Sequence, residues 1–118
     1  MVRANMMARN ALLGAPPFQV EQTLKKLGGD LRTARLRRNL TSEEVAQKIG
    51  TSRFAVADAE KGKPSTNVAV YAALLWAYGL IDRLADLADP SEDEEGTRLS
   101  LSREPARARH RRTLGNDF

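Results

Sequence analysis

Residues 41–62 read TSEEVAQKIGTSRFAVADAEKG and contain the signals that decide the fold. Thr41 and Glu44 have the spacing of a capping box, in which each side chain bonds the backbone N–H of the other at a helix start. The small Ala46 stands where a second helix must approach, and Gly50 stands where a turn requires a positive φ. The stretch therefore predicts a helix, a tight turn and a second helix.

The second helix of this pair has its own boundary signals. We expect it to begin after Thr51 or Ser52 and to end at Gly62, with Pro64 just beyond. Val56 is the apolar residue that fills the angle between the two helices. A small residue, a glycine and an apolar residue at this fixed spacing rarely occur together in an unrelated helical hairpin.

Helical periodicity continues on both sides of the pair. Apolar residues recur every three or four positions over residues 18–40, although the glycine pair at 28–29 is expected to split this segment or to kink it. A fourth helix is expected over residues 67–78 and a short fifth over residues 80–88. We predict an all-α domain, a bundle of four to five helices, over residues 18–89.

The two ends of the chain differ from this domain in composition. Residues 1–17 show no helical period and are predicted to be a flexible N-terminal lead-in. Residues 90–118 place an acidic block before a series of arginines, and few large apolar residues occur there. This composition predicts a charged, disordered tail. Nonspecific DNA binding, folding on a partner and a role in proteolytic turnover are all open for that tail.

Composition argues against catalysis. The chain has 118 residues, no cysteine and one histidine. That histidine, His110, lies in the arginine-rich tail, where nothing fixes its geometry. We predict no catalytic residues, no metal site, no cofactor and no enzymatic activity.

Charge and hydropathy point to a cytoplasmic protein with a polyanionic partner. The formal net charge is +4, which favours a partner such as nucleic acid. The longest apolar run, residues 68–81, is shorter than the roughly 20 residues needed to span a bilayer, so no membrane association is expected.

The motif and its flanks resemble the phage-repressor or XRE class of helix-turn-helix regulators, which has the lambda-repressor-like fold. The resemblance covers about residues 27–87 and includes Glu60-x-Gly62 after the second helix. Within the class, the segments LGGDLRTARLRRNLTSEEVAQKIGTSR and AEKGKPSTNVAVYAALLWAYGLIDRLADLADP are similar to HipB-like antitoxins. Those antitoxins repress the operon that encodes them and a HipA-like kinase toxin.

This resemblance implies a bacterial, nucleoid-associated repressor that binds double-stranded operator DNA and a HipA-like kinase toxin. Two alternatives remain open. One is a protein-interaction module that masks a kinase toxin and binds DNA weakly. The other is a stand-alone phage-type repressor.

In the geometry of this class, the second helix of the motif enters the major groove with its N-terminal residues at the base edges. Arg53 suits guanine O6 and N7, Phe54 suits the thymine methyl, and Asp58 suits cytosine N4. A carboxylate near phosphates also repels them, so Asp58 is alternatively expected to pair with a neighbouring Arg or Lys. The predicted base-reading residues are Ser52, Arg53, Phe54, Ala57 and Asp58.

Phosphate contacts are expected from helix N-termini and from lysines beside the second helix. A solvated face is the alternative for each of these charges. The predicted phosphate-binding residues are Thr41, Ser42, Thr51, Lys61, Lys63 and Arg38. The resemblance also implies that Arg35 and Glu60 form a structural ion pair inside the domain.

The fourth helix is apolar on nearly every face, which predicts burial on more than one side. A homodimer on a palindromic operator is the simplest explanation, with the recognition helices about 34 Å apart. The alternative is that this helix is only the centre of the core. The predicted dimer or core residues are Tyr71, Leu74, Leu75, Trp76 and Tyr78.

Overall fold

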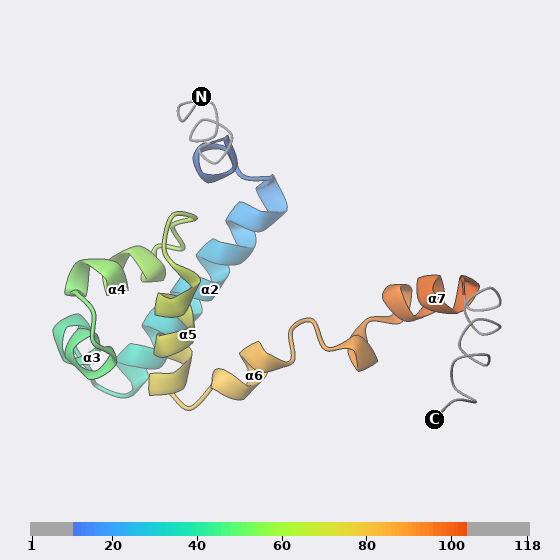
Figure 1. The fold of residues 1–118 in the computed structure, drawn as a ribbon. Helices are drawn as coiled ribbons and strands as arrows, with labels where there is room; N and C mark the ends of the chain where they lie inside the picture. The colour runs from blue at the N-terminus through green and yellow to red at the C-terminus, as the bar shows by residue number, and fades with distance from the viewer. Residues whose placement is uncertain (1–10, 104–118) are drawn as a thin grey trace. The chain divides into compact units, whose positions relative to one another are not determined.

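A computed structural model describes residues 11–103, and every regular element among them is a helix (Figure 1). The chain divides into two compact units between Leu84 and Ala85. The first unit contains the predicted all-α bundle. Its helices are α2 (Phe18–Arg37), α3 (Ser42–Ile49), α4 (Arg53–Glu60), α5 (Val68–Ala77) and the start of α6 (Ile81–Ala85).

The ends of α3 follow from local chemistry. The Thr41 hydroxyl accepts a hydrogen bond from the Glu44 backbone N–H at 3.1 Å, and the Glu44 carboxylate accepts one from the Thr41 N–H at 2.9 Å. This confirms the predicted capping box, and the bond from the Thr41 N–H lowers the pKa of the Glu44 carboxyl. Gly50 ends α3 with a φ of 81°, in the left-handed conformation expected for the turn.

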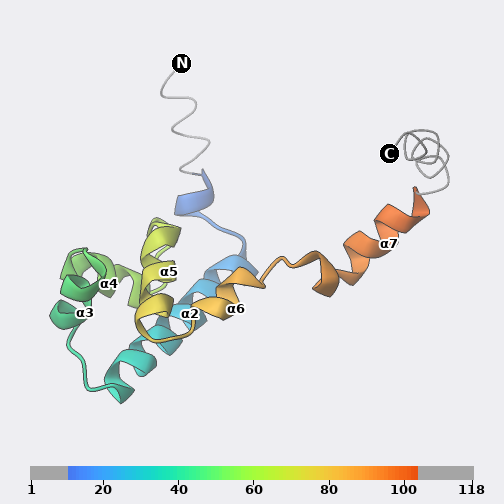
Figure 2. The same ribbon diagram turned by 60° about the horizontal axis from the view of Figure 1, so that its bottom comes forward.

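The helices α3 and α4 form the predicted pair around Val56, which is fully buried. Both views of the ribbon show α3 and α4 side by side, with α5 next to them (Figures 1 and 2). The Ser52 hydroxyl caps α4 by accepting a hydrogen bond from the Ala55 N–H at 3.2 Å. The cap fixes where α4 begins, and its buried side chains in the core fix its orientation.

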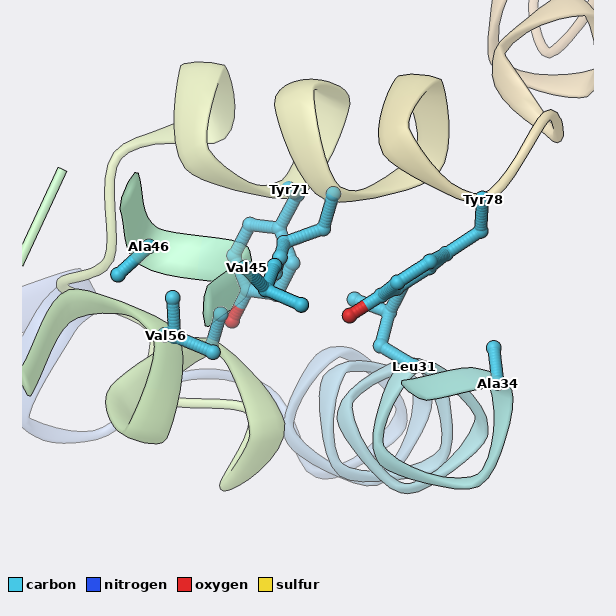
Figure 3. Packing of buried hydrophobic residues seen from close by; sticks show 9 residues of the cluster. Leu31, Ala34, Val45, Ala46, Val56, Tyr71 and Tyr78 are labelled. Atoms are coloured by element: carbon cyan, nitrogen blue, oxygen red, sulfur yellow. The ribbon is translucent and has the colours of Figure 1, made fainter. Parts of the chain in front are cut away.

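The core consists of apolar side chains from α2, α3, α4 and α5 (Figure 3). Leu31, Val45, Val56 and Leu74 are its largest fully buried side chains. Tyr71 adds a polar link, because its hydroxyl donates a hydrogen bond to the Lys63 carbonyl at 3.1 Å. This bond joins α5 to the segment that follows α4.

The glycine pair at 28–29 does not split the first long segment into two helices, which was one of the two outcomes predicted from the sequence. α2 is one helix of 20 residues. Gly28 is buried, and a Cβ there would lie 2.5 Å from the Ala59 carbonyl oxygen and 2.7 Å from the Gly62 nitrogen. A Cβ on Gly62 would in turn meet the backbone of Leu24. Gly28 and Gly62 are thus required for α2 and the end of α4 to pack backbone against backbone.

In the second unit, the described residues up to Arg103 form local helical structure. These residues include the 3-10 turn η1 (Pro90–Glu92) and α7 (Glu94–Ser102), neither of which has a buried residue. Asp93 caps α7 by accepting a hydrogen bond from the Gly96 N–H at 2.9 Å. This helix differs from the disorder expected over residues 90–118. The arginine-rich part with His110 and most of the predicted lead-in lie outside the described residues.

We predict that Gly28→Ala destabilises the protein by about 3 kcal/mol, at the upper end of the usual cost of overpacking. The reason is that the new methyl would meet backbone atoms, which cannot rotate away. Gly29→Ala is the matched control, because a Cβ at Gly29 has no atom within 4 Å. That control should stabilise α2 by about 0.5–1 kcal/mol.

Urea unfolding followed by circular dichroism measures both variants. Equal midpoints for the two alanine variants would show that the contact at Gly28 is not close.

Candidate nucleic-acid interface

The first turn of α4 presents three of the predicted base-reading residues. Ser52, Arg53 and Phe54 are all exposed, whereas Ala57 and Asp58 one turn later are half-buried. The exposed members of this predicted set are therefore concentrated at the N-terminus of α4. This is the part of a recognition helix that meets base edges in a major groove.

Arg53 and Phe54 lie against each other on this surface. The Arg53 guanidinium carbon is 5.1 Å from the centroid of the Phe54 ring, within the range of a cation–π contact. Phe54 is 68% exposed, a large apolar area for an unbound side chain. The pair forms without help from any other element.

Asp58 pairs with Lys63, the alternative that the sequence left open. Their charged groups are 3.5 Å apart, and each side chain is roughly half exposed. Such a pair is weak in water, but each charge lowers the field of the other. The Lys63 ammonium is thus less available to a phosphate than the sequence suggested.

Two carboxylates crowd the N-terminus of α3, where Thr41 and Ser42 were predicted to bind phosphate. Glu43 and Glu44 both lie in the first turn of this helix. The Thr41 N–H is already bonded to Glu44. These two negative charges therefore offset part of the positive end of the helix dipole, which leaves less of it to attract a phosphate. Lys61 is exposed just after α4, and Thr51 is half-buried just before it.

The exposed Arg38 bonds carbonyls of the domain itself, so its guanidinium is less available to a phosphate than the sequence predicted. Its guanidinium donates hydrogen bonds of 2.9 Å to the carbonyls of Ala34 and Tyr78. It also stacks 5.3 Å from the centroid of the Tyr78 ring. The side chain therefore links the end of α2 to the end of α5. The sequence could not show this link, because Tyr78 is 40 residues away.

Arg35 and Glu60 form the structural ion pair that the resemblance implied. The Arg35 Nε and Nη2 donate to the two carboxylate oxygens of Glu60 at 2.7 and 3.0 Å, and Nη1 donates to the Leu40 carbonyl at 2.9 Å. The side chains are only 11% and 8% exposed. Hydrogen bonding to Glu60 raises the pKa of Arg35 above its ordinary value. The pair fixes the last residue of α4 to α2.

The predicted dimer or core residues divide into two groups. Tyr71, Leu74 and Tyr78 belong to the core. Leu75 is half-buried, and Trp76 is 57% exposed. Burial raises the pKa of the Tyr78 hydroxyl, which has no hydrogen-bond partner among the described residues. α5 therefore has one side in the core and another in solvent.

A family model of helix-turn-helix domains matches residues 26–88, which is more than half of the chain. The chain belongs to the helix-turn-helix domain family, and this membership indicates a DNA-binding regulator. Neither the comparison with curated proteins nor that with solved structures found a match.

The described part of the chain has neither a membrane-spanning helix nor a metal-binding cluster. None of its helices is long and apolar enough to cross a membrane. Residues 11–103 also contain no cluster of histidine and acidic side chains that could hold a metal ion.

We predict that Glu60→Ala costs about 3–5 kcal/mol, because it leaves the Arg35 guanidinium buried without its partner. Asp30→Ala is the matched control. It also removes the acid of an ion pair, since Asp30 bonds Lys26 at 2.7 Å, but both of those side chains are exposed. The control should change stability by less than about 0.5 kcal/mol.

Denaturant midpoints with a common slope measure the two free energies of unfolding. A loss at Glu60 no larger than at Asp30 would contradict a structural role for the pair.

Proposed function

We propose that this protein is a sequence-specific DNA-binding transcriptional repressor that acts as a homodimer on a palindromic operator. The observation that carries the proposal is the exposed first turn of α4 in a helix-turn-helix domain, where Arg53 and Phe54 project from a helix that is capped at its start and held to α2 at its end. A base-reading helix needs such a support, because misplaced side chains lose the geometry of base-edge hydrogen bonds.

Arg53 is the main base-reading residue in this proposal. Its guanidinium makes no hydrogen bond or ion pair with the described residues, so its donors are available for guanine O6 and N7. Ser52, Phe54 and Ala57 complete the reading surface. Asp58 lies next to it, and its pair with Lys63 reduces the repulsion of phosphates.

The phosphate contacts proposed here come from residues that flank α3 and α4. Lys61 carries a free positive charge beside the end of α4 and makes no ion pair among the described residues. Lys63 adds to it when phosphate competes with Asp58. The remaining contacts come from hydroxyl and amide donors at the helix starts, namely Thr41, Ser42 and Thr51.

The homodimer is proposed from the solvent side of α5. Trp76 and Val68 are 57% and 69% exposed on a helix that contains no charged residue. A second copy would bury these side chains and bring two recognition helices onto one operator. Because each α4 offers few base contacts, two copies would also supply affinity that one copy lacks.

We further propose that the protein is the antitoxin of a HipBA-type module, regulating its own operon and binding a HipA-like kinase toxin. The support is the resemblance of residues 27–53 and 59–90 to HipB-like antitoxins. A neighbouring reading frame for such a kinase distinguishes an antitoxin from a stand-alone repressor. Kinase binding without an operator shift would favour the interaction module.

We predict that the protein shifts a duplex containing its own promoter and that Arg53→Ala weakens this binding by about 1–3 kcal/mol. The loss should be greatest for the operator and small for random DNA, because the lost contact is to a base. Arg32→Ala is the control. It removes the same charge from an exposed position on α2, so it should lower affinity for both duplexes slightly and equally.

Fluorescence anisotropy at two or more salt concentrations measures these affinities. An operator affinity that does not change in Arg53→Ala would eliminate Arg53 as a base-reading residue. No salt-sensitive, sequence-dependent binding by the wild type would eliminate the function.

We predict that Trp76→Glu converts the dimer to a monomer, because a carboxylate would have to be desolvated in the apolar interface. Phe18→Glu is the control, since Phe18 is also an exposed aromatic residue, 77% exposed, but lies on α2. Sedimentation velocity at micromolar concentration measures the oligomeric state. A monomeric wild type, or a dimer that persists in Trp76→Glu, would contradict this interface.

A further inference from the structure

We propose that Arg53 and Phe54 act as one reading unit, which recognises a guanine next to a pyrimidine that carries a C5-methyl group. The target is a T-G step or, equally, a 5-methylcytosine–guanine step. This inference rests on the proposed DNA-binding function and names the base step that α4 would recognise. It also predicts that a C-G step is bound more tightly when its cytosine is methylated.

The first argument is that the two side chains are already associated in the free protein. The Arg53 guanidinium carbon lies 5.1 Å from the centroid of the Phe54 ring. No carboxylate pairs with Arg53 within residues 11–103. The ring therefore restricts where the guanidinium can be while its N–H donors stay free. A side chain held in this way loses less entropy when it binds.

The second argument concerns what the ring itself can contact. Phe54 is 68% exposed although it is fully apolar, and it has no role in the core. In the major groove, the apolar feature of a base edge is the C5-methyl group of thymine. Cytosine presents the same feature only when it is methylated at C5. A phenyl ring at this position therefore selects a methylated pyrimidine over an unmethylated one.

The third argument is the spacing of the two contacts. Successive bases of one strand are about 3.4 Å apart along the axis. The 5.1 Å between guanidinium and ring is shorter than the span of two such steps. When Arg53 pairs with guanine O6 and N7, the Phe54 ring is thus placed over the neighbouring base. The unit reads one dinucleotide step rather than two independent positions.

The unit also explains how a weakly charged surface can be selective. Asp58 and the acids of α3 reduce the positive field around α4. These acids lower the nonspecific attraction to the phosphate backbone. Selectivity then depends on contacts that require both a guanine edge and a methyl group in register.

The experiment begins with selection of binding sites from a random duplex library by the full-length protein. One selected site is then made in four versions that differ only at the step: T-G, deoxyuridine-G, 5-methylcytosine-G and cytosine-G, each with its matching complement. We expect the two methylated steps to bind within about twofold of each other. Each unmethylated step should bind about fourfold more weakly, the effect of burying one methyl group.

The Phe54→Ala variant provides the second arm of the experiment. Because Phe54 is exposed, the substitution should leave the fold intact. We expect this variant to fold, as checked by circular dichroism, and to bind all four duplexes with equal affinity. Phe54→Tyr should keep the methyl preference, because it retains the ring face. A double-mutant cycle on the T-G site tests whether the two residues act together. The sum of the binding free energies lost in Arg53→Ala and in Phe54→Ala should exceed the loss measured in the double variant.

The outcomes separate this inference from the function on which it rests. Equal binding to T-G and deoxyuridine-G, or a methyl preference that survives in Phe54→Ala, would overturn the reading unit and leave the DNA-binding function intact. Selected sites without a T-G step would do the same. Failure to select any sequence would overturn both.

Discussion

The attachment of α4 to α2 is the constraint on which the rest of the structure depends. At one point the two backbones touch, because Gly28 leaves no side chain between α2 and the end of α4. Two turns further along α2, Arg35 holds the last residue of α4, Glu60, through two hydrogen bonds. A close contact without side chains and a bidentate ion pair together leave α4 little freedom to tilt or rotate.

As a result, one part of α4 packs against the domain and another part is exposed to solvent. The C-terminal end carries the ion pair and the glycine contact, and its middle carries Val56 into the core. The N-terminal turn is left exposed, with only the Ser52 hydroxyl to terminate it. Arg53 and Phe54 can therefore vary without disturbing the packing. A domain built in this way can change its target while its fold is retained.

The sequence could predict those features that depend on near neighbours. The capping box at Thr41, the positive φ of Gly50 and the start of α4 are all decided within four residues, so pattern reasoning found them. The ion pair of Arg35 and Glu60 spans 25 residues and was accessible only through the resemblance to a family. Gly28 was misread as a helix breaker, because a glycine inside a helix looks the same whether it bends the helix or admits a neighbour.

α5 shows most clearly what periodicity alone cannot decide. All ten of its residues are apolar or aromatic, so the sequence has no polar stripe to mark the solvent side. Tyr71 and Trp76 were placed in one group, yet the first is 5% exposed and the second 57%. Whether a residue of α5 is buried depends instead on whether it lies on the side of the helix that contacts α3 and α4. An apolar solvent side on a helix without charges favours a second surface over exposure to water, and that surface is what a dimer of this chain would provide.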